Sequence, residues 1–537
     1  MSKKSFVKIM MLVLSVVCFC SCSFMNGSDK EEDSIIVNDK SDNILNIGIE
    51  SVDTLNPVFT RSVSVKQAME FIFEPLFTFD EGLNPVCVLA TSCTPSDDSY
   101  SYTLKLREGI EWHDGTPFNA QDVLQTINLI RFQDSPYKEK LSPINSVSII
   151  DNYTLKISVG RPVPNFCTLL TFPVVKATVT HENLDSYIPV GTGPYKYDSK
   201  ITTDTIKLSK NTSWHDNQPA ISEIRLNVLK DKTAVVNAFN ASGVDVITTS
   251  VIDLKETTPH GEIYVSDYVS NNLVFLGINN QDKFLGEQNT KKAVSYLIDK
   301  EEIVTTEIFS RAVVCDVPVN PSAWYYPQVA KAQYDNEYVE DVLSLDGWRQ
   351  KDGDFVRDRI IGEGEEGEYT VDEYLKTSIL VNEDNEEKYR IALKIADTLS
   401  EFGIKTDVIT VDFASYNERI TKGEYSMFIG EIIMPDTMDQ YNLLCSENNW
   451  FLYNSENMKS AVYSLGISHG SEEQKNAFMN YQKIFSEELP FIPLFFRKES
   501  VIFEKSISGT GKPTVFKAFT NPENWYMSRI TDKADGE

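Results

Sequence analysis

Residues 106–123, with the sequence LREGIEWHDGTPFNAQDV, most constrain what this chain can fold into. The alternation over Thr103–Leu106 predicts a short strand at the start of this stretch. The polar run His113–Pro117 then predicts a tight turn. Asn119 then stands where a helix N-cap is expected, three residues before Asp122, and apolar residues follow at helical spacing. The stretch therefore predicts a strand, a polar corner and an amphipathic helix in direct succession.

A histidine beside an aspartate, as at His113 and Asp114, also invites a catalytic interpretation. The rest of the sequence does not support it. The five histidines are widely spread, and the chain contains neither an H-E-x-x-H nor a G-x-S-x-G motif. We therefore interpret His113 as a hydrogen-bonded corner residue, and we expect no enzyme, no cofactor and no metal site.

Length and charge narrow the class of protein. At 537 residues the chain is too long for a single hydrophobic core, so about three units are expected, possibly interleaved in sequence. Its 79 acidic residues against 50 basic ones give a net charge of −29. That balance argues against binding nucleic acid, where a basic stripe should dominate, and fits poorly with an anionic lipid surface.

The N-terminus predicts export from the cytoplasm. Three lysines precede an apolar run from Ile9 to Cys20, which is typical of a signal peptide and too short to span a membrane. Cys22 follows a small residue in a stretch that resembles a bacterial lipobox, so we predict a signal peptide over residues 1–22 and lipidation at Cys22. The alternative is a cysteine-rich signal sequence cleaved nearby. Residues 23–43 are polar and acidic, as a flexible tether would be.

The cysteines do not suggest a disulfide framework. Three lie at the signal end, and the body of the chain contains Cys87, Cys93, Cys167, Cys315 and Cys445. An odd, scattered set indicates that folding does not depend on disulfides. A Cys87–Cys93 bridge stays open as an alternative. No pair has C-x-x-C spacing, so a zinc or redox motif has little support.

The stretch 106–123 resembles, over almost every position, the pattern L-R-x-G-x-x-F/W-H-D-G-x-P-F-x-A-x-D-V of the family 5 extracellular solute-binding proteins. These are the receptors of oligopeptide, dipeptide and nickel ABC transporters. Further motifs follow in the family's order, including VGTGPYKY at 190–197, AFNASGVDV at 238–246, the predicted helix Thr290–Ile303 with Asp299 near its end, and FSEELPFIPLFF at 485–496. The resemblance extends from about Ile44 to the C-terminus.

Two stretches of the sequence, VGTGPYKY and Ile361–Glu373, each have a rival interpretation as a ligand-binding loop. In VGTGPYKY, two glycines and a proline predict a tight turn that another segment approaches closely; a phosphate loop would need a third glycine and a strand-to-helix junction. The run Ile361–Glu373, IGEGEEGEYTVDE, predicts a solvated acidic loop, and its spacing lacks the alternating ligands of a calcium loop.

A strand–helix–strand unit is predicted farther along the chain. Its first strand is Thr377–Val381, its helix is Glu387–Phe402, and its second strand, parallel to the first, is Ile404–Val411.

The resemblance implies an α/β fold of the periplasmic-binding-protein type (class II, type C), with two lobes, an extra subdomain and a two-strand hinge. The crossing strands would be Tyr268–Asn280 and the return near 485–496. The expected division is lobe I main domain at 44–69, 186–275 and 495–537, the extra subdomain at 70–185, and lobe II at 276–494.

The resemblance also implies that ligand is held between the lobes. Residues near the family's cleft are Glu50, Asn56 in the Leu-Asn-Pro turn, Asn279 at a strand end, and Trp324 and Tyr325 in the proline-aromatic loop Pro318–Pro327. In peptide receptors an aspartate in a W-x-x-D-x-x-D-P stretch holds the peptide's amino group. The corresponding region here, Tyr425–Leu444, lacks the tryptophan, and of its acids we favour Asp436 and then Glu431.

The implied function is the receptor of an ABC importer. It would capture a solute, most simply an oligopeptide, and deliver it to a membrane permease driven by cytoplasmic ATPases. It would work as a monomer anchored by lipid to the outer face of the bacterial cell membrane. Two alternatives remain: the same receptor type for a nickel chelate, sugar or other small solute, and a surface sensor or chaperone-like protein without transport.

Overall fold

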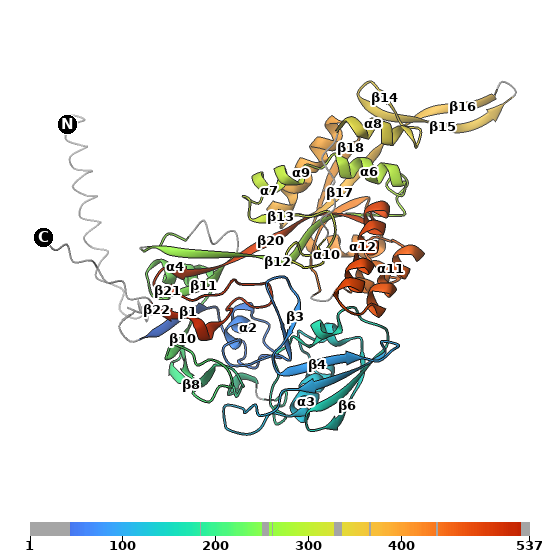
Figure 1. Cartoon of the computed structure of the whole chain (residues 1–537). Helices are drawn as coiled ribbons and strands as arrows, with labels where there is room; N and C mark the ends of the chain where they lie inside the picture. Colours follow the sequence, from blue (N-terminus) through green and yellow to red (C-terminus); the bar gives the residue numbers. More distant parts are fainter. Residues whose placement is uncertain are drawn as a thin grey trace, which may run out of the picture. The chain divides into compact units, whose positions relative to one another are not determined.

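A mixed sheet organises this protein (Figure 1), whose computed structural model describes residues 43–182, 184–249, 257–259, 261–326, 336–364, 367–435 and 439–527. These residues belong to one compact unit, residues 38–537. The sheet has the order β18-β17-β19-β12-β20-β11-β1-β10-β9-β8, with β13 paired to β20. Its strands are β1 (Ile44–Ile49), β8 (Tyr195–Thr202), β9 (Thr205–Lys210), β10 (Glu223–Val228), β11 (Val246–Thr249), β12 (Ile263–Ile278), β13 (Ala312–Val314), β17 (Lys376–Asn382), β18 (Lys405–Val411), β19 (Met427–Ile433) and β20 (Phe491–Glu504).

The long antiparallel strands β12 and β20 run through both parts of this sheet (Figure 1). Over Ile263–Val269, β12 pairs with β20 while β20 pairs with β11 on its other side. Beyond a register shift between Val269 and Leu273, β12 pairs with β19. Two strands with a bulge between their halves therefore join the two lobes, as the resemblance implied. The return strand begins later than expected, at Phe491, because residues 485–488 end α12 (Ser471–Glu488).

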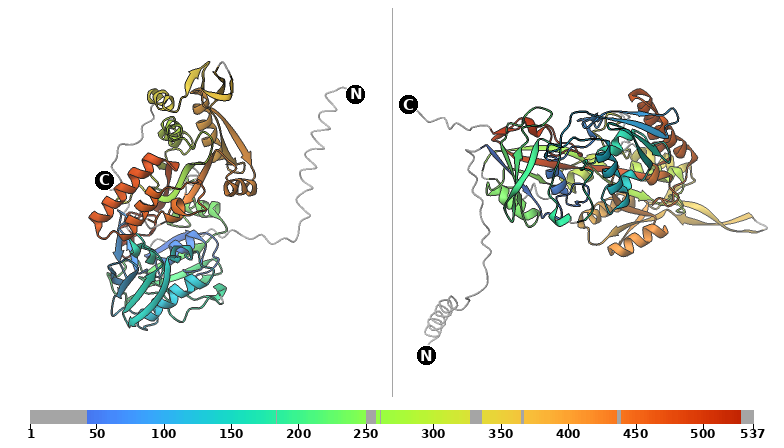
Figure 2. Two further views of the ribbon diagram at one scale, coloured as in Figure 1. Left: turned by 90° about the vertical axis from the view of Figure 1, so that its right-hand side faces the viewer. Right: turned by 90° about the horizontal axis from the view of Figure 1, so that it is seen from below.

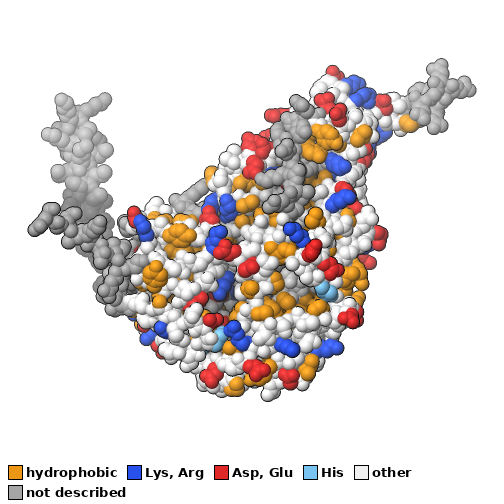
Figure 3. Space-filling model, viewed as in Figure 1, with side chains coloured by type: hydrophobic (Ala, Val, Ile, Leu, Met, Phe, Trp, Pro, Cys, Tyr) orange, Lys and Arg blue, Asp and Glu red, His pale blue; other side chains and the backbone are white. Residues whose placement is uncertain are grey.

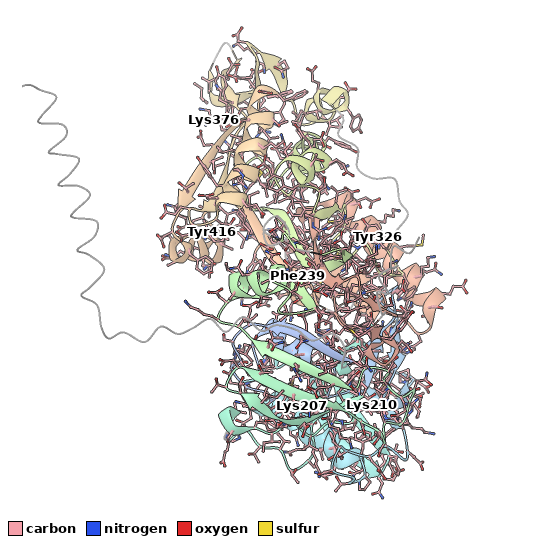
Figure 4. The ribbon with its side chains drawn as sticks, turned by 90° about the vertical axis from the view of Figure 1, so that its left-hand side faces the viewer. Lys207, Lys210, Phe239, Tyr326, Lys376 and Tyr416 are labelled. Carbon is pink, nitrogen blue, oxygen red and sulfur yellow. The ribbon has the colours of Figure 1, made fainter. Side chains whose placement is uncertain are left out.

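The lobe that contains β1 combines two sheets. β1 is parallel to β10, and the helices α2 (Val63–Met69) and α4 (Lys232–Asn240) contact it. A second, four-stranded sheet has the order β4-β5-β7-β6, made of β4 (Ala90–Pro95), β5 (Ser101–Leu106), β6 (Ile144–Asp151) and β7 (Thr154–Val159), beside helix α3 (Ala120–Phe132). Residues from both sheets share one hydrophobic core, which includes Leu45, Leu104 and Ile127. Figure 4 labels Lys207 and Lys210 on β9 and Phe239 on α4 in this lobe.

The other lobe contains the predicted strand–helix–strand unit. β17 and β18 are parallel and α9 (Glu386–Glu401) joins them, so this prediction is confirmed. Its apolar side buries Ile391 and Ile395 against β17. The remaining helices of this lobe are α6 (Gln288–Tyr296), α7 (Lys300–Thr306), α8 (Asn336–Ser344), α10 (Phe413–Lys422), α11 (Glu456–Ile467) and α12 (Ser471–Glu488). Figure 4 labels Lys376 on β17 and Tyr416 on α10, and Figure 2 shows α11 and α12 side by side.

Two local predictions differ from the structure. The helix expected over Thr290–Ile303 is broken into α6 and α7, because the Asp299 side chain accepts a hydrogen bond from the backbone N–H of Glu302 and starts a new helix. The acidic stretch expected as a loop lies mostly in a hairpin of β15 (Asp354–Gly364) and β16 (Gly367–Tyr374), which projects from its lobe beside β14 (Arg349–Lys351) (Figures 1 and 2). Ion pairs such as Arg357–Glu373 across the hairpin offset its negative charge.

The described residues also form shorter elements. They are β2 (Phe77–Phe79), β3 (Pro85–Cys87), β21 (Ile507–Ser508), β22 (Tyr526–Met527), the π-helical turn Tyr441–Cys445 and the 3₁₀ turns Glu139–Leu141, Phe166–Leu170, Leu184–Ser186 and Pro522–Asn524. Within the parts of the chain described above, no helix has both the length and the apolar character needed to cross a membrane.

The predicted strand, corner and helix of residues 106–123 are confirmed. The strand is β5, and Asn119 and Asp122 form a reciprocal capping box at the start of α3. At the corner, His113 Nε2 lies 3.0 Å from the carbonyl oxygen of Gly193, and the N–H of Gly191 donates to His113 Nδ1 over 3.2 Å. His113 is therefore the hydrogen-bonded corner residue that the sequence indicated, and it joins the corner to the second glycine-rich motif.

The turn at 190–197 is also confirmed as a site of close backbone approach. A Cβ atom on Gly191 would lie 1.8 Å from the carbonyl oxygen of Ile72, and one on Gly193 would lie 2.8 Å from the same atom. That carbonyl accepts a hydrogen bond from Gly193 N–H over 2.9 Å. Only glycine fits at these positions, which explains the motif by packing.

Candidate ligand-binding cleft

A cleft of about 560 Å³ lies where β12 and β20 change register. Its walls come from α2, residues 70–79, the turn at Trp214–Asp216, the bulge Ser270–Asn272 and residues 515–518. The cleft is thus built at the point where the strands shared by the two lobes leave their regular ladder. Acidic and basic side chains are interspersed over the face of the molecule seen in Figure 3.

A buried carboxylate lies in the wall of this cleft. Glu74 is only 8% exposed and stands between Phe73 and Pro75, where the backbone bonds to the neighbouring segment through Val174 N–H. Its Oε1 lies 3.4 Å from Nε2 of His215. Its Oε2 has no hydrogen-bond partner among the described residues, and neither has Nε1 of the adjacent Trp214. An unpaired acceptor and an unpaired donor, both on the wall, favour a ligand that carries both kinds of polar group.

Charges of both signs line the same cleft. The acidic side chains are Glu70, Glu74, Asp216, Glu499 and Glu523, and the basic ones are Lys66, Arg107, Lys140 and Lys517. Burial raises the pKa of Glu70 to about 8 against the opposing charge of Lys517, so at neutral pH Glu70 is mostly protonated and can donate a hydrogen bond. Burial lowers the pKa of Lys66. The cleft therefore has complementary groups for a ligand with both a cationic and an anionic end.

The bulge at the cleft is held by one buried amide. Asn320 Nδ2 donates to the carbonyl oxygens of Val269 (3.3 Å) and Ser270 (3.1 Å) and to Oδ1 of Asn271 (2.8 Å). The carbonyl of Asn271 also accepts from Met434 N–H over 2.8 Å, just after β19 ends. These bonds replace the ladder bonds that the register shift interrupts, so they fix the crossing strands beside the cleft.

A second group of contacts joins the four-stranded sheet's lobe to the segments that follow β19. Arg161 forms an ion pair with Asp439, and its guanidinium lies 4.8 Å from the ring centre of Tyr441. The hydroxyl of Ser99 lies 2.9 Å from Nε2 of His469. Both contacts join residues of the lobe with the four-stranded sheet to residues that follow β19. They would therefore have to break if these two parts moved apart.

The structure places Glu431 in an ion-pair network. Its carboxylate lies 2.7 Å from Nε of Arg497 and 3.1 Å from Nζ of Lys388, and Arg497 also pairs with Glu387. Burial raises the pKa of Glu431, but the hydrogen bonds and charges of Arg497 and Lys388 outweigh it and lower the pKa overall. The charge of Glu431 is thus already balanced by Arg497 and Lys388. Glu431 itself is outside the cleft lining, although Ile433, two residues later, is part of it.

The other predicted ligand residues lie outside the lining of this cleft. Asn279 is buried, and its amide donates to the carbonyls of Gly423 and Tyr425. The Asn56 side chain accepts from Val58 N–H inside its turn, and the Glu50 N–H donates to the hydroxyl of Ser64 at α2. In these three places the contacts that the structure gives are structural ones, and the Nδ2 of buried Asn56 has no hydrogen-bond partner among the described residues.

The aromatic loop lies apart from the cleft as well. The backbone N–H of Trp324 donates to the Gly82 carbonyl over 2.7 Å, whereas its buried indole Nε1 has no hydrogen-bond partner among the described residues. Tyr325 packs edge-on against Phe478, with ring centres 4.5 Å apart. Tyr325 borders a separate cavity of about 20 Å³. Figure 4 labels the next residue, Tyr326. Asp436 and Cys22, the other two predicted positions, lie outside the described residues.

Sequence reasoning missed Glu74, Trp214 and His215 as candidate ligand contacts. A signal for Glu74 was present, because it is the single acid in the apolar run FIFEPLF, and such an acid is either paired or functional when it is buried. Its closeness to His215, 141 positions away, follows only from the fold. Among the described residues, no group of three or more His, Cys, Asp or Glu side chains is arranged to hold a metal ion.

The sequence matches the model of the bacterial extracellular solute-binding proteins, family 5 Middle, over residues 84–451. The chain belongs to family 5 of these solute-binding proteins. The resemblance seen in the motifs is therefore confirmed, and the family is one of solute-binding receptors. The members of this family are extracellular proteins, so this chain is located outside the cytoplasm.

Two curated relatives show the range of similarity. The oligopeptide-binding protein AppA of Bacillus subtilis (strain 168) is 21% identical over 556 residues, covering 98% of this chain and 99% of AppA. The glutathione-binding protein GsiB of Escherichia coli (strain K12) is 28% identical over 309 residues, which cover 55% of this chain and 59% of GsiB. AppA thus matches over its full length and GsiB over part of it.

Solved structures share the fold. HbpA2 from Haemophilus parasuis has a TM-score of 0.76 at 19% identity and covers 90% of this chain and 100% of its own. A nickel ABC transporter protein from Bacillus halodurans has a TM-score of 0.75 at 18% identity with the same coverage. AppA from Bacillus subtilis in complex with a nonapeptide has a TM-score of 0.61 at 18% identity, covering 90% and 99%. The predicted α/β fold of the periplasmic-binding-protein type is confirmed.

Proposed function

We propose that this family 5 protein is the receptor of an ABC importer that captures oligopeptides in the cleft at the bulge of β12. The observation that carries the proposal is the lining of that cleft. It combines side chains of both charges with the Oε2 of Glu74 and the indole N–H of Trp214, neither of which has a hydrogen-bond partner within the described part of the chain. A peptide with free ends offers an ammonium group, a carboxylate and main-chain N–H and C=O groups, so each lining group has a counterpart in it. The similarity to AppA supports the same ligand class.

Capture would couple binding to closure of the lobes. We assign residues 44–69, 186–275 and 495–537 with the subdomain 70–185 to one lobe, and 276–494 to the other. The crossing strands β12 and β20 act as the hinge between them. Ligand favours the closed form only by the difference in its affinity for the two forms. The Arg161–Asp439 pair and the Ser99–His469 contact add to that difference because they span the two lobes.

The cellular setting follows from the N-terminus. We propose that a lipid on Cys22 anchors the protein to the outer face of the cell membrane, with residues 23–43 as tether. From there the monomeric, loaded receptor would deliver its cargo to permease subunits and their ATPases. Among the sequence's predicted ligand residues, Asp436 stays our candidate for a contact to the peptide's amino group, because it stands three positions after Ile433, the cleft residue that ends β19.

Native mass spectrometry of the protein purified from its own cell envelope tests the ligand class. We expect a bound mass that tandem fragmentation resolves into amino-acid residues. A bound nickel chelate or a sugar would overturn the peptide assignment and support the receptor for another small solute. Recovery of the protein with no bound solute, and no binding to a mixed peptide library by calorimetry, would favour the sensor or chaperone-like alternative.

A further inference from the structure

Three of the five cysteines in the body of the chain gather in one place, although the sequence separates them widely. Cys87 ends β3, Cys93 lies in β4, and Cys167 lies in the 3₁₀ turn Phe166–Leu170. All three are free thiols, and the thiols of Cys93 and Cys167 are hydrogen-bonded to each other. Cys93 and Cys167 also pack against the same hydrophobic core.

Backbone register explains why these two thiols meet. Cys93 is paired with Leu104 across β4 and β5, and Pro95 with Tyr102, so the side chains of Cys93 and Tyr102 are on the same face of the sheet. The ring of Tyr102 is stacked on that of Phe166, with ring centres 3.8 Å apart and planes 8° from parallel. This stack sets the 3₁₀ turn on that face and brings the next residue, Cys167, over β4.

We propose that Cys93 and Cys167 form a disulfide bond once the folded protein meets a disulfide oxidant outside the cytoplasm. The thiolate of Cys167 attacks one sulfur of the oxidant, a mixed disulfide forms, and one oxidant thiolate leaves. Cys93 then loses its proton and attacks the Cys167 sulfur, which expels the second oxidant thiol. Two protein thiols are oxidised to one disulfide while the oxidant disulfide is reduced to two thiols.

The order of these two steps follows from the hydrogen bond. The hydrogen bond with the Cys93 thiol lowers the pKa of Cys167, which favours Cys167 as the first thiolate. The same bond, together with burial, raises the pKa of Cys93. Cys87 is the third thiol of the cluster, but it is exposed at the end of β3, where it pairs with Phe77 across β2. This differs from the Cys87–Cys93 bridge that the sequence left open.

The bond would hold a segment that the candidate cleft uses. Six residues before Cys167 stands Arg161, which pairs with Asp439 of the other lobe, and four residues after it stands Thr171, which lines the cleft. A covalent tie from Cys167 to β4 would attach this segment to the four-stranded sheet at a point between these two residues. Because it links positions far apart in sequence, it also restricts the unfolded chain.

Peptide mapping of the purified full-length protein tests the bond. The protein is incubated with oxidised glutathione, the remaining thiols are alkylated, and the sample is digested without reduction and analysed by mass spectrometry. Chymotrypsin must accompany trypsin, because no lysine or arginine lies between Cys87 and Cys93, whereas cleavage after Leu89 separates them. Single variants Cys93→Ser and Cys167→Ser, with Cys87→Ser as the matched control, are treated in the same way.

We expect a peptide containing Cys93 linked to one containing Cys167 in the wild type and in Cys87→Ser, and its loss in the other two variants. Oxidation should raise the melting temperature of Cys87→Ser by about 3–5 °C and leave Cys93→Ser and Cys167→Ser unchanged. A Cys87–Cys93 or Cys87–Cys167 linkage as the main product would overturn the proposal. Alkylation of both Cys93 and Cys167 in the oxidised folded protein would overturn it equally.

Discussion

At the scale of single residues, the candidate cleft depends on polar atoms that folding brings to its wall without pairing them. Burying a carboxylate oxygen without a partner is unfavourable, and the Oε2 of Glu74 is in that state among the described residues. A ligand that donates to this oxygen removes the penalty. In the same way, a ligand that accepts a hydrogen bond from the indole N–H of Trp214 removes the cost of burying that donor, which has no partner among the described residues. Ligand affinity at these two side chains therefore depends on the energetic cost of leaving their polar atoms unpaired.

Replacing Glu74 with glutamine should weaken peptide binding by about 10- to 100-fold, because a hydrogen bond to a charged group contributes about 1.5–3 kcal/mol. Isothermal titration calorimetry with the peptide identified by native mass spectrometry measures the change. The matched control is Glu108→Gln, an exposed acid outside the cleft. Equal affinity of Glu74→Gln and the wild type would remove Glu74 from the site.

His113 gives the protein a predictable dependence on pH. Burial lowers the pKa of His113 to about 4, below its ordinary value of 6.5, so the folded state binds fewer protons than the unfolded state between these values. The stability that neutral His113 contributes is complete above about pH 6.5 and is lost as the pH falls toward 4. The loss amounts to about 3 kcal/mol.

Urea unfolding of the wild type and of His113→Gln at a series of pH values checks this prediction. Subtracting the two curves isolates the contribution of His113 from that of the carboxylates, which both proteins share. We expect the wild type to lose more stability than the variant between pH 6.5 and pH 4. Parallel curves over this interval would show that the His113 corner does not titrate as its burial indicates.

At the scale of elements, the sequence predicted what neighbouring residues decide together. Residues 103–123 contain their own strand alternation, turn residues and capping box, so the strand, corner and helix were predictable. The break between α6 and α7 was not, because the apolar spacing continues across Asp299 and only its capping bond reveals the new helix start. The hairpin β15–β16 was also missed, because its acidic composition is typical of a loop while its ion pairs form only across strands.

The candidate site was predictable only in part for the same reason. The glycine turn could be read from its own residues, but its partner Ile72 lies 119 positions before Gly191. The contact of Glu74 with His215 and the network around Glu431 likewise join distant segments. Pairings of this kind depend on the whole fold, so a motif can indicate the type of protein without indicating which side chains line its cleft.

The glycine turn offers a test of element packing. Gly191→Ala would place a methyl group 1.8 Å from the Ile72 carbonyl oxygen, so the turn or the segment after α2 must shift. We expect a loss of about 3 kcal/mol in unfolding free energy. Gly261→Ala is the matched control, because a Cβ there meets no atom within 4 Å, and it should change stability by about 0.5 kcal/mol or less. Similar denaturation midpoints for the two variants would contradict the close approach.

At the scale of the whole molecule, the fold, the family and the cleft converge on one mode of action. Two long strands join the lobes, the cleft lies at their register shift, and contacts such as Arg161–Asp439 connect the lobes elsewhere. A ligand bound at the bulge would touch the first lobe and the crossing strand β12, and it would meet the second lobe at Ile433. Its two ends are then the chemical features that the receptor can distinguish, because the lining carries charges of both signs.

Isothermal titration calorimetry of the full-length protein with one defined peptide in free and capped forms tests this account most directly. The peptide recovered by native mass spectrometry is compared with its N-acetylated and C-amidated derivatives. We predict that the free peptide binds and that capping either end weakens binding by about tenfold or more, since each cap removes one charge-assisted contact. Equal affinity for the free and capped forms would contradict the account.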